Sequence, residues 1–227
     1  MITAQRRITW AGWGFAIGSA LFMAGVPLSL SSTLSPAVAG WTYFAGSVFF
    51  TSAATLQSLA SWRPDDEGTV PWAQWNRADR ANLVAALVQW VGTIEFNVTT
   101  LRAALEAASR HDYTAQSVWS PDAIGSILFL VSSAIALAPE VHRRRHHRVR
   151  DRAWMIAAVN MLGSVLFGVS AVAAWTNPST GQILSLWWAN FGTFAGAACF
   201  LVGAILMLPF APSDEPVGSE PVRREPG

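Results

Sequence analysis

Apolar residues fill six long stretches of the chain, and charged residues gather mostly in the gaps between them. The stretches run roughly 9–31, 39–61, 82–104, 121–140, 153–175 and 183–209. A helix needs about 20 mostly apolar residues to cross a bilayer, and the six stretches reach this length. The pattern predicts an all-α polytopic membrane protein with six transmembrane helices in three tandem hairpins, at about 9–61, 82–140 and 153–209.

A short motif recurs in every stretch: a glycine, a small residue next to it, and a phenylalanine four positions after the glycine. Residues four apart share a helix face, and small residues let helices approach closely in lipid. Each phenylalanine is therefore expected to fill the space left by the glycine of a partner helix. The predicted packing residues are Gly18, Phe22, Gly46, Phe50, Gly92, Phe96, Gly125, Phe129, Gly163, Phe167, Gly196 and Phe200.

The repeating unit is a two-helix hairpin, which returns the chain to the side from which it started. The three hairpins are therefore parallel, and a pseudo-threefold bundle is one arrangement open to them. Transporters built on inverted repeats use units of opposite orientation, and no such repeat is evident here.

With this unit the chain resembles the YrhK-like membrane proteins, a family of small bacterial proteins built on two helices. The resemblance covers roughly 80–210 and rests on VGTIEFNVTT, WSPDAIGSILFLVSS, NMLGSVLFGVSAVAAW and GAACFLVGAILMLP. Glu95 departs from the apolar residue expected at its position. The family has no established activity, so the resemblance implies architecture and not function. The P-x-[DE]-x-x-[KR] signature of mitochondrial-type carriers does not occur in the sequence.

Arginine positions predict the orientation. All fifteen basic residues are arginine, and thirteen of them fall on one side of a six-span topology, leaving Arg102 and Arg110 on the other. Cytoplasmic loops carry the excess of basic residues, so we expect an inner (plasma) membrane protein with both termini in the cytoplasm. Residues 1–210 form the predicted membrane domain. The segment 211–227 is rich in Pro and Glu and is predicted to be a disordered cytoplasmic tail.

Glu95 raises the main functional question, because a charged residue at a helix centre costs about 2.5–3.5 kcal/mol on insertion scales. One interpretation is a proton or cation transport site, with Gln89, Asn97 and Asn160 lining the route. The other is a neutral carboxyl group that hydrogen-bonds to another helix, at Asn160 or Asn190. Gln89 and Asn160 both stand three residues before a repeat glycine, and interhelical hydrogen bonding is the alternative role for them.

The densest charge cluster lies between the fourth and fifth stretches, at 142–152. It predicts a site for anionic lipid headgroups, and the alternative is that it only enforces orientation. The residues concerned are Arg143, Arg144, Arg145 and Arg148. His142 and His146 have the spacing of a helical metal pair, but no metal site is expected because no adequate ligand set accompanies them. Ser120, Pro121 and Asp122 are expected to begin the fourth helix, since Pro suits a first helical turn.

Composition narrows the functional classes. Charged residues make up 13% of the chain, against about 25% in soluble domains. P-loop, HExxH and G-x-S-x-G motifs do not occur in the sequence, so neither an enzyme nor a cofactor is expected. A net charge of +1, with its arginine cluster between two spans, argues against nucleic-acid binding. Two functions stay open: a structural or interaction role in the bilayer, including assembly as a homo-oligomer, and transport of a small ion or solute using Glu95.

Overall fold

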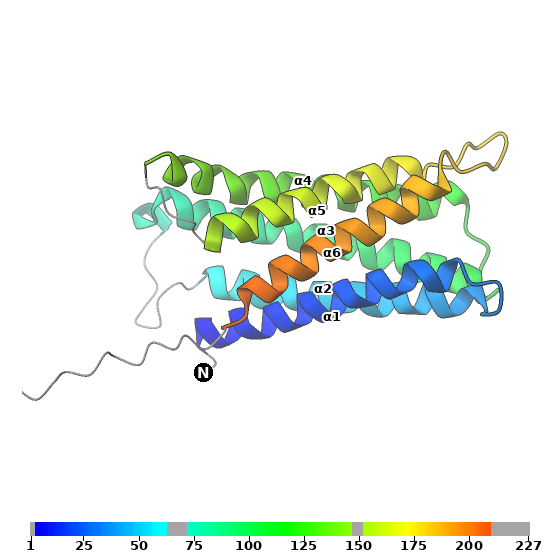
Figure 1. Ribbon diagram of the computed structural model, residues 1–227, viewed down its shortest axis with the longest axis horizontal. Coiled ribbons are helices and arrows are strands. Elements are labelled where there is room, and N and C mark those ends of the chain that lie inside the picture. The colour runs from blue at the N-terminus through cyan, green and yellow to red at the C-terminus, as the bar shows by residue number, and fades with distance from the viewer. Residues whose placement is uncertain (1–2, 63–71, 147–151, 210–227) are drawn as a thin grey trace, which may run out of the picture.

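The computed structural model describes residues 3–62, 72–146 and 152–209, and within them the fold is all-α, as predicted (Figure 1). A short 3-10 helix, η1, precedes the third long helix and contains Trp72. The elements are α1 (Ala4–Ser29), α2 (Pro36–Trp62), η1 (Trp72–Gln74), α3 (Arg77–Ala107), α4 (Ala115–His146), α5 (Arg152–Ala173) and α6 (Leu186–Met207). The predicted tail, 211–227, lies outside the described residues.

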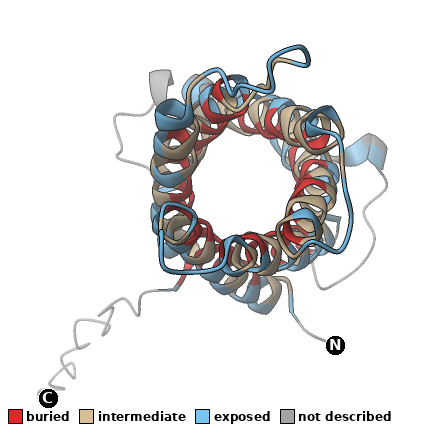
Figure 2. Ribbon diagram, turned by 90° about the vertical axis from the view of Figure 1, so that its right-hand side faces the viewer, coloured by how far each residue is buried: buried red, intermediate tan, exposed pale blue. Residues whose placement is uncertain are grey.

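The six long helices form a closed ring in chain order. Each helix packs against the helices before and after it, and α6 packs against α1 to close the ring. Buried residues line the inside of this ring, as Figure 2 shows in a view along its axis. We call the end that holds residues 4 and 207 the terminal end. The far end holds the α1–α2, α3–α4 and α5–α6 connections.

The start of α4 differs from the prediction. The helix begins at Ala115, where the Thr114 hydroxyl accepts a hydrogen bond from the Ser117 amide at 3.2 Å, so Pro121 lies inside the helix. Proline cannot donate to the carbonyl four residues back, which is that of Ser117. Arg102 Nη1 on α3 donates to this carbonyl at 2.6 Å. A neighbouring helix thus satisfies the group that the proline leaves free, which allows proline within a membrane helix.

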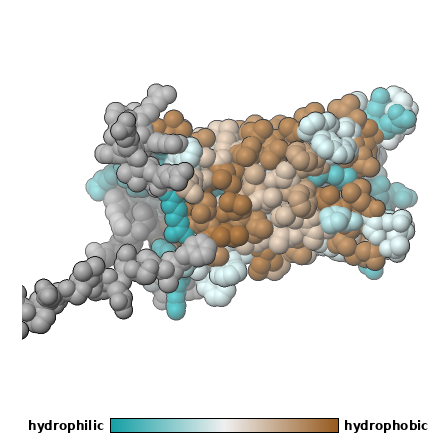
Figure 3. All heavy atoms as spheres, viewed as in Figure 1, coloured by the Kyte–Doolittle hydropathy of each residue, from teal (hydrophilic) through white to brown (hydrophobic). Residues whose placement is uncertain are grey.

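Four helices are long and apolar enough to cross a membrane: α1, α4 over Ala115–Val141, α5 and α6. The chain is therefore a multi-pass helical membrane protein. An apolar surface covers the middle of the ring, with polar residues toward its ends (Figure 3). Helices α2 and α3 are at least as long, but they do not meet the same criterion of composition.

Glycine and phenylalanine pack reciprocally within each hairpin. A Cβ added to Gly18 would lie 2.9 Å from Phe50 Cδ2, and one added to Gly46 would lie 2.8 Å from Phe22 Cδ2. The same exchange joins α3 to α4 and α5 to α6. The other pairs are Gly92 with Phe129, Gly125 with Phe96, Gly163 with Phe200, and Gly196 with Phe167. Any side chain at these glycines would displace the partner's ring or backbone.

In α2 and α5 the small residue after the glycine bonds to the other neighbour of that helix in the ring. Ser47 on α2 hydrogen-bonds to Thr100 on α3 at 2.9 Å, and Ser164 on α5 to Ser133 on α4 at 2.7 Å. Consecutive residues lie about 100° apart around a helix, close to the angle between the two neighbours of a helix in a six-membered ring. A residue four positions after the glycine falls between these two directions and points at the ring axis. The three-part motif therefore fits the position of each helix between two neighbours in the ring.

Candidate functional site

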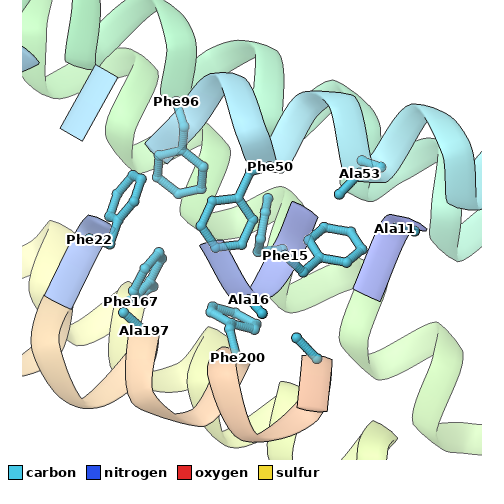
Figure 4. Close-up of a cluster of buried hydrophobic side chains, with 13 residues drawn as sticks. Ala11, Phe15, Ala16, Phe22, Phe50, Ala53, Phe96, Phe167, Ala197 and Phe200 are labelled. Atoms are coloured by element: carbon cyan, nitrogen blue, oxygen red, sulfur yellow. The ribbon is translucent and has the colours of Figure 1, made fainter. Parts of the chain in front are cut away.

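The phenylalanines of the six motifs meet on the ring axis and close it (Figure 4). Phe50, Phe129 and Phe200 contact one another, with ring centroids 5.6 to 6.4 Å apart. Their helices α2, α4 and α6 do not pack directly against each other in the described residues, so these side chains bridge the ring. We call the six residues the phenylalanine plug.

The plug has two layers with approximate threefold symmetry. The second layer comes from the odd-numbered helices, where Phe22 and Phe96 lie 6.0 and 5.8 Å from Phe167. Each hairpin joins the layers through one edge-to-face pair at 5.1 to 5.5 Å. Such a geometry is favourable for aromatic rings, at about 0.5–1.5 kcal/mol per pair beyond burial. The axis is therefore shut by a packed apolar constriction.

A polar cavity of about 370 Å³ lies inside the ring on the terminal side of the plug. Its lining comes from five helices, which places it on the axis rather than at a seam between two helices. The polar lining residues are Gln57, Ser61, Asn82, Gln89, Ser132, Ser133, Glu140 and Asn160. We call this cavity the vestibule. Because Ser61, Asn82 and Glu140 lie near the terminal ends of their helices, the vestibule reaches that end of the ring.

A small chamber of about 20 Å³ lies between the vestibule and the plug. Phe50 and Phe200 line it from the plug, and Gln57, Gln89 and Asn160 line both it and the vestibule. These three carboxamides come from α2, α3 and α5, so each hairpin supplies one. The chamber is the point at which the polar part of the axis ends.

Gln89 and Asn160 do not hydrogen-bond to other helices. Within the described residues the structure shows no hydrogen bond from either side chain to another helix, so it gives no support to the alternative role as interhelical links. The Gln57 Oε1 atom is buried and lacks a donor. Buried amides normally find partners, and a polar cavity that admits water can supply them.

The structure separates Glu95 and Asn97 from the two amides with which they were grouped. The Cβ of Glu95 lies beside Gly125 in the α3–α4 interface. Asn97 Nδ2 donates to Thr51 Oγ1 on α2 at 2.7 Å, in the opposite interface of α3. Neither residue lines the vestibule or the chamber. Of the four proposed transport residues, the ring axis therefore brings together only Gln89 and Asn160.

The repeat register places two further residues on the axis: Gln57, which the sequence analysis did not single out, and Asp122, which it assigned only to the start of a helix. Gln57 stands seven positions after Phe50, about two helical turns further along the same face. It is the third carboxamide of the chamber, with Gln89 and Asn160. Asp122 stands seven positions before Phe129, the same register that Gln89 has relative to Phe96. Residues seven apart share a helix face, so counting from each phenylalanine would have found both.

The arginine cluster is described only in part. Helix α4 extends to His146, so the backbone of Arg143, Arg144 and Arg145 is helical, but their side chains are outside the described part of the structure. The fourth predicted lipid-binding residue, Arg148, lies outside the described residues altogether. Among the described residues no group of His, Cys, Asp and Glu side chains is arranged to hold a metal ion.

An apolar groove of about 1080 Å³ lies at the α4–α5 seam, between Trp119 and Trp188. Gly168 faces it, with no atom within 4 Å of an added Cβ, and Trp119 Nε1 donates to the Ala171 carbonyl at 2.8 Å beside it. Its lining has little polar character, so it offers no groups for chemistry.

No known protein family, curated protein or solved structure matches the chain.

Proposed function

We propose that this membrane protein is a conduit for small polar solutes along the axis of its helix ring, held closed by the phenylalanine plug. The observation that carries the proposal is the polar vestibule, which ends at an apolar constriction formed by the phenylalanine plug. Hydrophobic constrictions of this kind gate channels by excluding water. A purely structural protein gains nothing from amides that face a cavity without protein partners, since unpaired buried polar groups cost stability.

The proposal includes six membrane-spanning helices. Exposed Val84, Leu87, Val91 and Ile94 form one apolar stripe along the outside of α3, and α2 exposes Val48 and Phe49. Gln57 and Gln89, which lower the hydropathy of these helices, lie on the inner face that lines the vestibule. We further propose that the terminal end is cytoplasmic in an inner (plasma) membrane, because most arginines fall there in sequence.

A structural or interaction role is the second candidate, and the resemblance to YrhK-like proteins is compatible with either. In the sequence, the small-residue face of each helix is the feature that indicates an interaction role. Those faces contact neighbouring helices inside the ring, as the Gly18–Phe50 and Ser47–Thr100 contacts illustrate. They are therefore not free for a partner. The α4–α5 groove is the outer feature that favours this candidate, with Gly168 facing open space.

Solute flux into liposomes tests the conduit. The plug variant is Phe50→Ala, Phe129→Ala and Phe200→Ala combined, and its matched control changes three exposed phenylalanines, Phe49, Phe191 and Phe194, to Ala. The plug variant should pass a small polar solute such as urea, whereas the control should match wild type. Each Phe→Ala change costs about 3–5 kcal/mol in a packed core, so the single variant Phe129→Asn, which wets the constriction, is measured as well. Folded plug variants as tight as protein-free liposomes would overturn the proposal.

A further inference from the structure

The chamber beneath the plug has the size of a single small molecule. Its volume of about 20 Å³ exceeds the roughly 10–15 Å³ that one water molecule needs by the same kind of measure. A bound water also needs two to four polar partners, and Gln57, Gln89 and Asn160 supply three. The remaining lining is apolar: Phe15, Phe50, Phe200, Ala204 and Met207.

The chemistry of the chamber favours an uncharged occupant. Each carboxamide offers an acceptor oxygen and a donor NH₂ group, and the chamber lining contains no ionisable residue. A monovalent cation would find oxygens here but no compensating charge, and it would have to lose its water against the apolar rings of Phe50 and Phe200. Taking an unpaired ion out of water is far more costly than taking out a neutral molecule that keeps its hydrogen bonds.

The buried Gln57 Oε1 atom is an independent indication of a ligand. It lacks a donor among the described residues, and Gln57 lines the chamber. An unsatisfied buried acceptor costs about 1–3 kcal/mol, so a molecule that donates a hydrogen bond to it is stabilised in the chamber. Gln89 and Asn160 complete the set from the other two hairpins.

We propose that Gln57, Gln89 and Asn160 form a binding site for one small uncharged molecule that both donates and accepts hydrogen bonds, water being the smallest of this class. This inference rests on the proposed function, for which the site selects the solute that reaches the plug. The conduit then discriminates against ions twice, first by the neutral amides and then by the apolar rings.

The test compares an uncharged probe with a charged one in the same liposomes. Urea and K⁺ permeabilities are measured for the plug-opened protein (the triple Ala variant or Phe129→Asn) and for the same protein with Gln57→Leu, Gln89→Leu or Asn160→Leu added. Gln116→Leu, an exposed glutamine on the far end of α4, is the control. Loss of one neutral hydrogen bond should lower urea permeability about fivefold, and K⁺ should stay near the protein-free leak in all variants.

Two failures are distinguishable. If the plug-opened protein passes K⁺ as readily as urea, or if the three Leu changes leave urea permeability as high as the Gln116→Leu control, the amide site is overturned and the conduit stands. If no folded variant passes either probe, the conduit itself is overturned. Thermal unfolding in detergent separates lost selectivity from lost structure, and Gln57→Leu should keep its stability because it removes an unpaired acceptor.

Discussion

The rings of Phe96 and Phe129 lie edge to face with centroids 5.1 Å apart, and each ring covers the repeat glycine of the other helix. One pair of residues thus performs two tasks. It holds α3 against α4 where both backbones carry glycine, and it places two rings on the axis of the helix ring. Closing the axis and packing the hairpins are the same interaction, so changes at the glycines should affect both.

Adding a methyl group at Gly92 should destabilise the protein. Its Cβ would lie 2.9 Å from Phe129 Cδ2, and overpacking a filled site costs about 1–3 kcal/mol. Gly168→Ala is the matched control, because nothing lies within 4 Å of its added Cβ and Ala favours a helix over Gly by about 0.8–1.0 kcal/mol. Thermal unfolding in detergent should place Gly92→Ala below wild type and Gly168→Ala at or above it. The reverse order would contradict the packing.

Two serines at the same repeat position should respond differently to alanine. Ser19 and Ser47 are both fully buried, but the Ser19 hydroxyl has no partner, whereas that of Ser47 bonds to Thr100. Ser19→Ala should leave stability unchanged or raise it. Ser47→Ala should lower it by about 0.6 kcal/mol, the average for such bonds in membranes. Equal losses at both sites, measured by unfolding, would count against the contacts assigned to the two seams.

Arg102 and Pro121 should be energetically coupled. Arg102 donates to the Ser117 carbonyl, which Pro121 deprives of its helical partner. Arg102→Met should cost about 1 kcal/mol in wild type and little in a Pro121→Ala background, where the helix satisfies that carbonyl itself. A double-mutant cycle measures the difference. Additive effects would mean that the arginine does not replace the missing bond.

Glu95→Gln should leave solute flux unchanged in the plug-opened protein. Glu95 lies beside Gly125 in the α3–α4 interface and outside the lining of the vestibule and the chamber. Urea and proton fluxes measured with and without the change should therefore agree, in contrast to Gln89→Leu. A clear loss of flux in a folded Glu95→Gln protein would restore this carboxylate as a transport residue.

The sequence predicted the helices and the partners of Gly and Phe because these follow from local spacing. It did not predict the ring, because the motif shows that a helix has two contact faces but not which helix occupies each. This ambiguity explains the grouping of Glu95 with Gln89. Gln89 stands three residues before Gly92, and Glu95 stands three residues after it. Because Thr93 contacts α2, the face of α3 that carries Gln89 is turned toward the axis and the face that carries Glu95 is turned away from it.

The start of α4 and the arginine cluster show two other limits. Local sequence rules predict Pro121 in a first turn because the compensating donor, Arg102, lies on another helix and leaves no local signal. The charge at 142–152 predicts the orientation from arginine counting alone, and that orientation stays a prediction. The rule for the first turn of a helix therefore failed at Pro121 because another helix supplied the partner of the freed carbonyl.

The proposed conduit requires that the polar vestibule be accessible from the terminal end and stop at the phenylalanine plug. Cysteine labelling from each side of the membrane tests it most directly, in a Cys199→Ala background that removes the native thiol. With a membrane-impermeant maleimide, Asn160→Cys should react in inverted vesicles and stay unlabelled in spheroplasts, where Ser179→Cys on the far end reacts. Adding Phe129→Asn should make the Asn160→Cys thiol reactive from both sides. Labelling from both sides with the plug intact, or from neither side in a folded protein, would contradict the account.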